Sequence, residues 1–157
     1  KILISACLIV DKTKYDGKSN YNPLVKNLLE KFELVPFCPE VEGGLPTPRQ
    51  PSEIIKDKVM NKEGKDVTRN FKDGASKALM ICQYLGIKMA ILKEGSPSCG
   101  LNQVYDGTFS GKKIKGSGIT AQLLIKNGIK VISENDIEKS IISHFVCTNF
   151  CLRVRSG

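Results

Sequence analysis

Four short apolar runs are spread along the chain, and they constrain its fold more than any other feature. The runs are Ile2–Ser5, Leu34–Phe37, Met89–Leu92 and Lys130–Ser133. Short runs rich in bulky aliphatic residues are typical of strands that are buried on both faces of a sheet. We therefore expect four buried strands.

Helical patterns separate these runs. Between Ala75 and Leu85, apolar residues recur at helical spacing at Ala75, Ala78, Leu79 and Cys82. Gly86 and Gly128 stand where two of the helices should end. The expected helical segments are Leu24–Phe32, Ala75–Leu85, Gly118–Asn127 and Asp136–Phe145.

Strands that alternate with helices predict an α/β fold. We expect three layers, in which a mostly parallel, Rossmann-like sheet lies between helices. The prediction is a single domain over residues 1–142, followed by a C-terminal tail over residues 143–157.

Two segments interrupt the alternation. Val41–Ser52 is dense in Gly and Pro, and we expect a rigid surface loop there. Val59–Thr68 has the pattern of a hairpin that turns at Glu63-Gly64, with Thr68 as a candidate N-cap of the next helix.

Composition excludes several classes of protein. The chain has 157 residues, and no apolar run approaches the roughly 20 residues of a membrane-spanning helix. We expect a cytoplasmic protein that does not contact a membrane. The net charge is +8, but the lysines are dispersed and few aromatic residues lie among them, so nucleic acid is not the expected partner. The basic stretch Gly111–Gly116 matches no phosphate-binding loop and is expected to be a surface turn.

Six cysteines in a reducing compartment are not expected to form a disulfide framework. Cys7, Cys38 and Cys99 each follow one of the predicted strands. Because the carboxyl ends of parallel strands meet at one edge of a sheet, these residues should converge there. One such cysteine could be an ordinary buried residue, but three at three strand ends favour a site for a soft metal, zinc or iron–sulfur. Cys82 lies on the apolar face of its helix and is expected in the core.

The tail carries a second possible set of ligands. His144, Cys147 and Cys151 follow one another at helical spacing, so a second metal site there is conceivable. Packing or simple exposure of these side chains is the interpretation we favour.

An ordered series of motifs over roughly residues 2–134 resembles the family known as domain of unknown function 523, which includes the thiouracil desulfidases. The first of these motifs lies near the start of the chain. The motifs include Ser5–Leu8, Lys14–Gly17, Cys38–Arg49, Gly64–Thr68, Ser96–Gly100 and Tyr105–Phe109. Where many members have a further cysteine, this chain has Thr13.

The resemblance implies an oxygen-labile [4Fe-4S] cluster, which we expect to be lost on aerobic isolation. Cys7, Cys38 and Cys99 stand at the family's ligand positions, and three thiolates leave one iron free to bind a substrate sulfur. Glu40 stands where a carboxylate would activate water. Either Ser96 or Ser98 could orient that water or the ring carbonyl, and the sequence does not decide between them.

Two further residues are candidates for substrate binding. Asp16 could face the site or simply build a turn, and Arg49 could clamp a carbonyl or an anionic group or remain solvated.

The resemblance implies an enzyme that hydrolyses the thiocarbonyl group of a small thiolated nucleobase, such as thiouracil, to the oxo base and sulfide. The alternative is a non-catalytic iron–sulfur or metal-binding module for sulfur handling or sensing. A third reading of the residues is a nucleotide-binding α/β domain whose cysteines are reduced and hold no metal.

Overall fold

The computed structural model describes residues 1–9 and 12–138. Its central sheet consists of β1 (Ile2–Ser5), β2 (Leu34–Phe37), β5 (Met89–Leu92) and β8 (Lys130–Ser133). The strands lie in the order β2-β1-β5-β8, and every neighbouring pair is parallel. The prediction of four strands and a parallel sheet is therefore confirmed.

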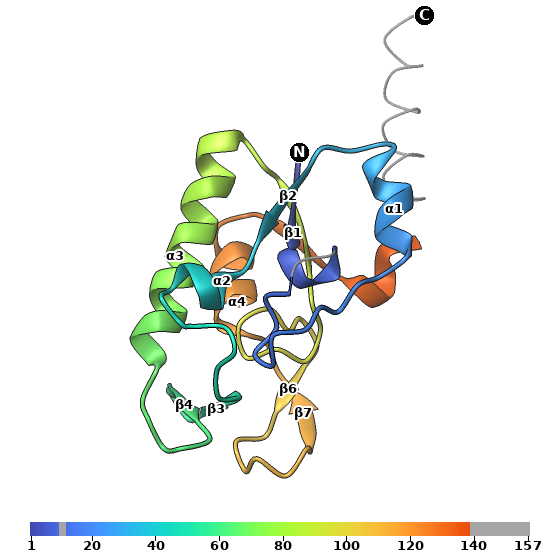
Figure 1. The fold of residues 1–157 in the computed structure, drawn as a ribbon. Coiled ribbons are helices and arrows are strands. Elements are labelled where there is room, and N and C mark those ends of the chain that lie inside the picture. The colour runs from blue at the N-terminus through green and yellow to red at the C-terminus, as the bar shows by residue number, and fades with distance from the viewer. Residues whose placement is uncertain (10–11, 139–157) are drawn as a thin grey trace, which may run out of the picture.

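Helices cover both faces of the sheet (Figure 1). On one face, α3 (Thr68–Leu85) and α4 (Ile119–Lys126) pack through Ala78 and Leu124 in a cluster that includes Leu3 of β1. On the other face, α1 (Leu24–Leu29) packs in a cluster that includes Ile2 and Ile4. Side chains that alternate between two buried faces explain why the strands are apolar throughout. The predicted three-layer α/β architecture is confirmed.

Glycines end two of these helices, as predicted. Gly86 follows α3 with a φ of 66°, and Gly128 lies just beyond α4 with a φ of 80°. A left-handed residue of this kind lets the chain turn away while it satisfies the last carbonyl groups of the helix. The expected helix Asp136–Phe145 falls mostly outside the described residues. Its first residue ends a short 3₁₀ helix, η2 (Glu134–Asp136).

Two antiparallel hairpins lie together beyond the carboxyl ends of the strands (Figure 1). One hairpin pairs β3 (Ser52–Ile55) with β4 (Lys58–Asn61), and the other pairs β6 (Gln103–Tyr105) with β7 (Lys113–Lys115). β3 begins at the last residue of the segment that we expected to be loop throughout. That segment also contains the end of a short helix, α2 (Pro39–Glu42).

Only part of the hairpin expected at Val59–Thr68 is present. The chain turns at Gly64, and Met60 forms an isolated bridge with Asp66, but the main partner of β4 is β3. The prediction that Thr68 caps α3 is wrong. Thr68 is the first residue of that helix, and its hydroxyl accepts the N–H of Val59 at 2.9 Å instead. Among the described helices, none is long and apolar enough to cross a membrane.

Candidate metal centre

Three cysteines meet at one cavity beyond the carboxyl ends of the sheet. Cys7 follows β1 in the short 3₁₀ helix η1 (Ala6–Leu8), Cys38 follows β2, and Cys99 lies in the loop after β5. All three line a cavity of about 420 Å³. Cys82 does not line it, because its side chain is fully buried on α3 in the core.

Close backbone contacts hold two of the cysteine-bearing segments in place. Cys38 immediately precedes α2, and a Cβ atom at Gly74 of α3 would lie 2.7 Å from the carbonyl carbon of Pro39. A Cβ atom at Gly118 would lie 2.8 Å from the amide nitrogen of Cys99. Glycine at these two positions therefore allows α3 and the start of α4 to pack directly against the chain beside the cysteines.

Hydrogen bonds organise the loop that carries Cys99. The Ser96 hydroxyl oxygen accepts the N–H groups of Ser98 and Cys99, each at 3.1 Å. The Glu94 carboxylate accepts the N–H groups of Leu101, Asn102 and Gln103, at 2.9–3.0 Å. Burial disfavours the charged form of Glu94, but these hydrogen bonds outweigh it and lower the pKa of that carboxyl group.

The electrostatics of the thiols show that the three cysteines affect one another. Burial raises the pKa of Cys99 strongly, and Cys38 and Cys7 raise it further, although a hydrogen bond from Ser5 opposes them. Burial also raises the pKa of Cys7, while the side-chain N–H of Asn20, 3.4 Å from the sulfur, opposes that rise. Such thiols release a proton when a metal binds, so the site would couple proton release to metal loading.

Three thiols are ligands of the kind that iron–sulfur clusters use. Within the described residues, no three side chains of His, Cys, Asp or Glu are grouped closely enough to hold one metal ion. The thiolates of an iron–sulfur cluster bind separate irons, so they surround a larger group and lie further apart than the ligands of one ion. The wall of the cavity also contains a buried hydroxyl oxygen without a hydrogen-bond partner, Oγ1 of Thr13. Three thiols and an unpartnered hydroxyl around one cavity fit a [4Fe-4S] cluster.

Glu40 lies beside the cysteines and is held on both sides. Its Oε2 accepts the Nε–H of Arg49 at 2.7 Å, and its Oε1 lies 3.5 Å from the hydroxyl oxygen of Ser96. The side chains of Glu40 and Arg49 are only 14% and 6% exposed, so solvent screens this ion pair weakly. Arg49 also donates to the carbonyl oxygens of Thr13 and Pro46, at 2.9 and 3.3 Å. Arg49 thus ties Glu40 to the loop at Pro46 and to the chain after Cys7.

The remaining predicted site residues are placed differently. Ser98 also lines the cavity, but it is 1% exposed and its hydroxyl shares a hydrogen bond of 3.0 Å with the hydroxyl of Thr120 on α4. Its side chain therefore already packs the loop. Asp16 is not among the residues that line the cavity. Its carboxylate accepts hydrogen bonds from Lys14 Nζ and from the N–H of Lys18. Asp16 therefore builds a turn, which was one of the two roles that the sequence allowed. His144, Cys147 and Cys151 lie outside the described residues.

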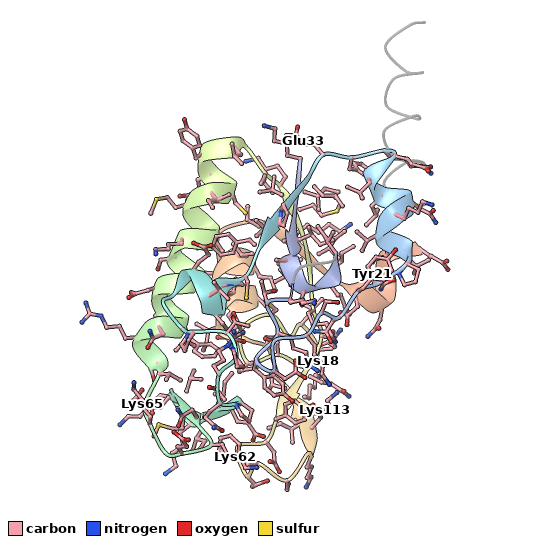
Figure 2. The ribbon with its side chains drawn as sticks, viewed as in Figure 1. Lys18, Tyr21, Glu33, Lys62, Lys65 and Lys113 are labelled. Atoms are coloured by element: carbon pink, nitrogen blue, oxygen red, sulfur yellow. The ribbon has the colours of Figure 1, made fainter. Side chains whose placement is uncertain are left out.

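Further residues line the cavity for which the sequence analysis predicted no role. Two of them are Lys62 and Lys113, one from each hairpin region. Both are labelled in Figure 2. Glu53 of β3 and Phe109 of the β6–β7 loop also line the cavity. Phe109 belongs to a motif of the family resemblance, and this was the only signal in the sequence that could have identified it.

Comparisons with known proteins agree with this geometry. The family described as 2-thiouracil desulfurase matches residues 2–136 of the chain. The uncharacterized protein YbbK of Bacillus subtilis (strain 168) is 42% identical over 146 residues, which cover 87% of this chain and 97% of that protein. A solved structure described as the [4Fe-4S]-dependent thiouracil desulfidase TudS is also 42% identical. It superimposes with a TM-score of 0.88 and covers 93% of this chain and 98% of that one.

Proposed function

Because this chain belongs to the 2-thiouracil desulfurase family, we propose that it is an iron–sulfur-dependent desulfidase. The proposed reaction is hydrolysis of the thiocarbonyl group of a thiolated nucleobase, such as thiouracil, to the oxo base and sulfide. The observation that carries the proposal is the meeting of three cysteines and a paired carboxylate, Glu40, at one cavity. Similarity in sequence and fold to a [4Fe-4S]-dependent thiouracil desulfidase supports the same assignment.

Cys7, Cys38 and Cys99 are the proposed ligands of a [4Fe-4S] cluster. When it is bound, the cluster supplies an iron without a protein thiolate, which can bind the sulfur that leaves the substrate. Asn20 donates to the sulfur of Cys7 at 3.4 Å. Hydrogen bonds of this kind stabilise thiolates and orient them as ligands.

Glu40 is the proposed general base. It accepts one proton from water as the water oxygen attacks the thiocarbonyl carbon. This proton, and the proton that the attacking oxygen still carries, pass to the departing sulfur as the C–S bond breaks and the C=O group forms. The C–S bond is exchanged for a C–O bond, and the products are the oxo base and hydrogen sulfide, so no electrons are consumed. Arg49 holds one carboxylate oxygen of Glu40, which leaves the other oxygen for Ser96 and water. We therefore assign Arg49 the role of orienting Glu40.

Ser96 is better placed than Ser98 to assist Glu40 in the reaction. The Ser96 hydroxyl oxygen lies 3.5 Å from Glu40, whereas the Ser98 hydroxyl is bonded to Thr120 in the interior. Ser96 can orient the water or the ring carbonyl, and it also fixes the loop of Cys99. The enzyme is expected to act in the cytoplasm as a hydrolase on a small molecule, with no role for nucleic acid.

The experiment compares Glu40→Gln with Glu42→Gln in protein reconstituted anaerobically with iron and sulfide. Glu42 belongs to the same short helix, but it is exposed and does not line the cavity. We expect Glu40→Gln to keep the absorption spectrum of the cluster and to release sulfide from thiouracil about 10²–10⁴-fold more slowly. Glu42→Gln should behave as the parent protein does. If Glu40→Gln turns over at the parent rate, Glu40 is not the base, and if it assembles no cluster, Glu40 supports the metal site instead.

A further inference from the structure

A buried carboxylate links the two hairpins at the cavity. Glu53 lies in the middle of β3, and only 6% of its surface is exposed. One of its oxygens, Oε2, accepts the N–H of Gly107 at 2.8 Å and the N–H of Phe109 at 3.1 Å. Both donors lie in the loop between β6 and β7. A buried carboxylate is costly unless it is hydrogen-bonded, so this contact fixes the loop against β3.

The loop holds Phe109 in a conformation that bulky residues avoid. The φ of Phe109 is 56°, in the left-handed region. Lys56 has a similar φ of 58°, but it lies in the two-residue turn between β3 and β4, where hairpin geometry requires a left-handed residue. Phe109 lies in the longer loop of the β6–β7 hairpin, where its N–H donates to the buried carboxylate of Glu53. A strained residue persists only where its surroundings determine its conformation, and such residues cluster at functional sites.

Phe109 is one of four aromatic residues that line the cavity, with Tyr15, Phe37 and Tyr105. The ammonium groups of Lys14 and Lys113 lie 5.2 and 5.3 Å from the ring centroids of Tyr15 and Tyr105. Within the part of the chain that the structure describes, no cation lies over the ring of Phe109 in this way. Phe37 is only 7% exposed and packs in the core cluster that contains Leu3. The ring of Phe109 is therefore the one best able to receive another planar group.

We propose that Phe109 forms the surface on which the pyrimidine ring of the substrate stacks, and that Glu53 is the positioning residue that holds Phe109 in place. This inference rests on the proposed function, because it assigns the recognition of the planar substrate at the same site. A flat ring held against one wall of the cavity would have a fixed orientation relative to the cysteines and Glu40. Stacking on an aromatic side chain suits this purpose, because every base offers a π face.

The test measures two quantities on the cluster-loaded enzyme: the kinetics of sulfide release from thiouracil, and the equilibrium binding of uracil, the oxo product. Phe109→Leu removes the aromatic face but keeps an apolar side chain at the same φ. We expect KM for thiouracil and Kd for uracil to rise about 5- to 150-fold, the usual contribution of base–aromatic stacking, with a smaller change in kcat. Phe109→Tyr retains a ring and should restore both values. Tyr84→Leu, on the exposed surface of α3, is the control and should change neither.

Glu53→Gln tests the positioning role separately. It should raise both constants, and its effect should not add to that of Phe109→Leu in the double variant, because Glu53 acts through Phe109. Uracil affinity at the parent value in either single variant overturns the proposal, as does full additivity in the double variant. Uracil binding does not depend on turnover. A parent enzyme that binds uracil through Phe109 but releases no sulfide would therefore refute the proposed function and leave this inference standing.

Discussion

The contact between α2 and α3 gives a quantitative prediction for Gly74→Ala. The added Cβ would lie 2.7 Å from the carbonyl carbon of Pro39 and closer still to its oxygen. Carbon atoms pack best at about 3.5 Å, so the two helices must separate by about 0.8 Å or more. The obstructing atoms belong to the backbone of Pro39, and no side-chain rotation can move them aside.

Two opposing effects decide the stability of this variant. In the interior of an unobstructed helix, alanine is more favourable than glycine by about 1 kcal/mol. Overpacking of a tight contact typically costs about 1–3 kcal/mol, and a backbone contact lies at the upper end of that range. The net effect should be destabilisation by about 1–2 kcal/mol.

Activity should fall more than stability. Pro39 lies between Cys38 and Glu40, so a shift of α2 moves a proposed ligand and the proposed base together. A displacement of about 1 Å in a catalytic group can lower the rate about 100-fold, and we expect a loss of that order in sulfide release.

Urea unfolding of the metal-free protein and anaerobic sulfide-release assays measure the two effects. Ser76→Ala, at an exposed position of the same helix, is the matched control and should leave both unchanged. A Gly74→Ala variant that is as stable and as active as the parent would refute the claim that this contact positions Cys38 and Glu40.

Three further predictions concern other parts of the site. Cys82→Ala should lower the free energy of unfolding by about 1 kcal/mol but leave the iron content unchanged, because Cys82 lies in the core. Ser98→Ala should cost about 1 kcal/mol through the lost bond to Thr120 while kcat is nearly retained, a combination that unfolding and kinetic assays separate. The pKa of Glu94 is lowered on folding, so its stabilising contribution is complete above the ordinary pKa of 4.5 and is lost as the pH falls through the lower folded value. Unfolding measured below pH 4.5 should show this loss, and Glu94→Gln should abolish it.

The sequence predicted the parts of the site that depend on strand ends. The sequence alone predicted that Cys7, Cys38 and Cys99 lie close together, because the carboxyl ends of parallel strands share one edge of a sheet. Glu40 followed from its place beside Cys38 in a motif of the family resemblance. The convergence of the three cysteines needed only the existence and direction of the strands, which short apolar runs indicate well.

The hairpins could not be predicted in the same way. In β3 the buried residue is the acidic Glu53, whereas the apolar Ile55, two residues further along the same face, is 37% exposed. Apolar character therefore does not mark the buried position of this strand. The burial of Glu53 depends on N–H groups more than 50 residues away in the chain. The choice between Ser96 and Ser98 likewise depends on Thr120, which only the folded chain brings to Ser98.

The central claim is that this chain binds an iron–sulfur cluster and hydrolyses a thiocarbonyl group. The most direct test is anaerobic reconstitution, followed by incubation with thiouracil in water enriched in ¹⁸O. The account predicts about four irons per chain, sulfide and uracil in equal amounts, and ¹⁸O in the uracil, without consumption of a reductant. A protein that binds iron but releases no sulfide would contradict the account and support a non-catalytic module. A protein that binds no iron under these conditions would contradict the assignment of Cys7, Cys38 and Cys99 as ligands.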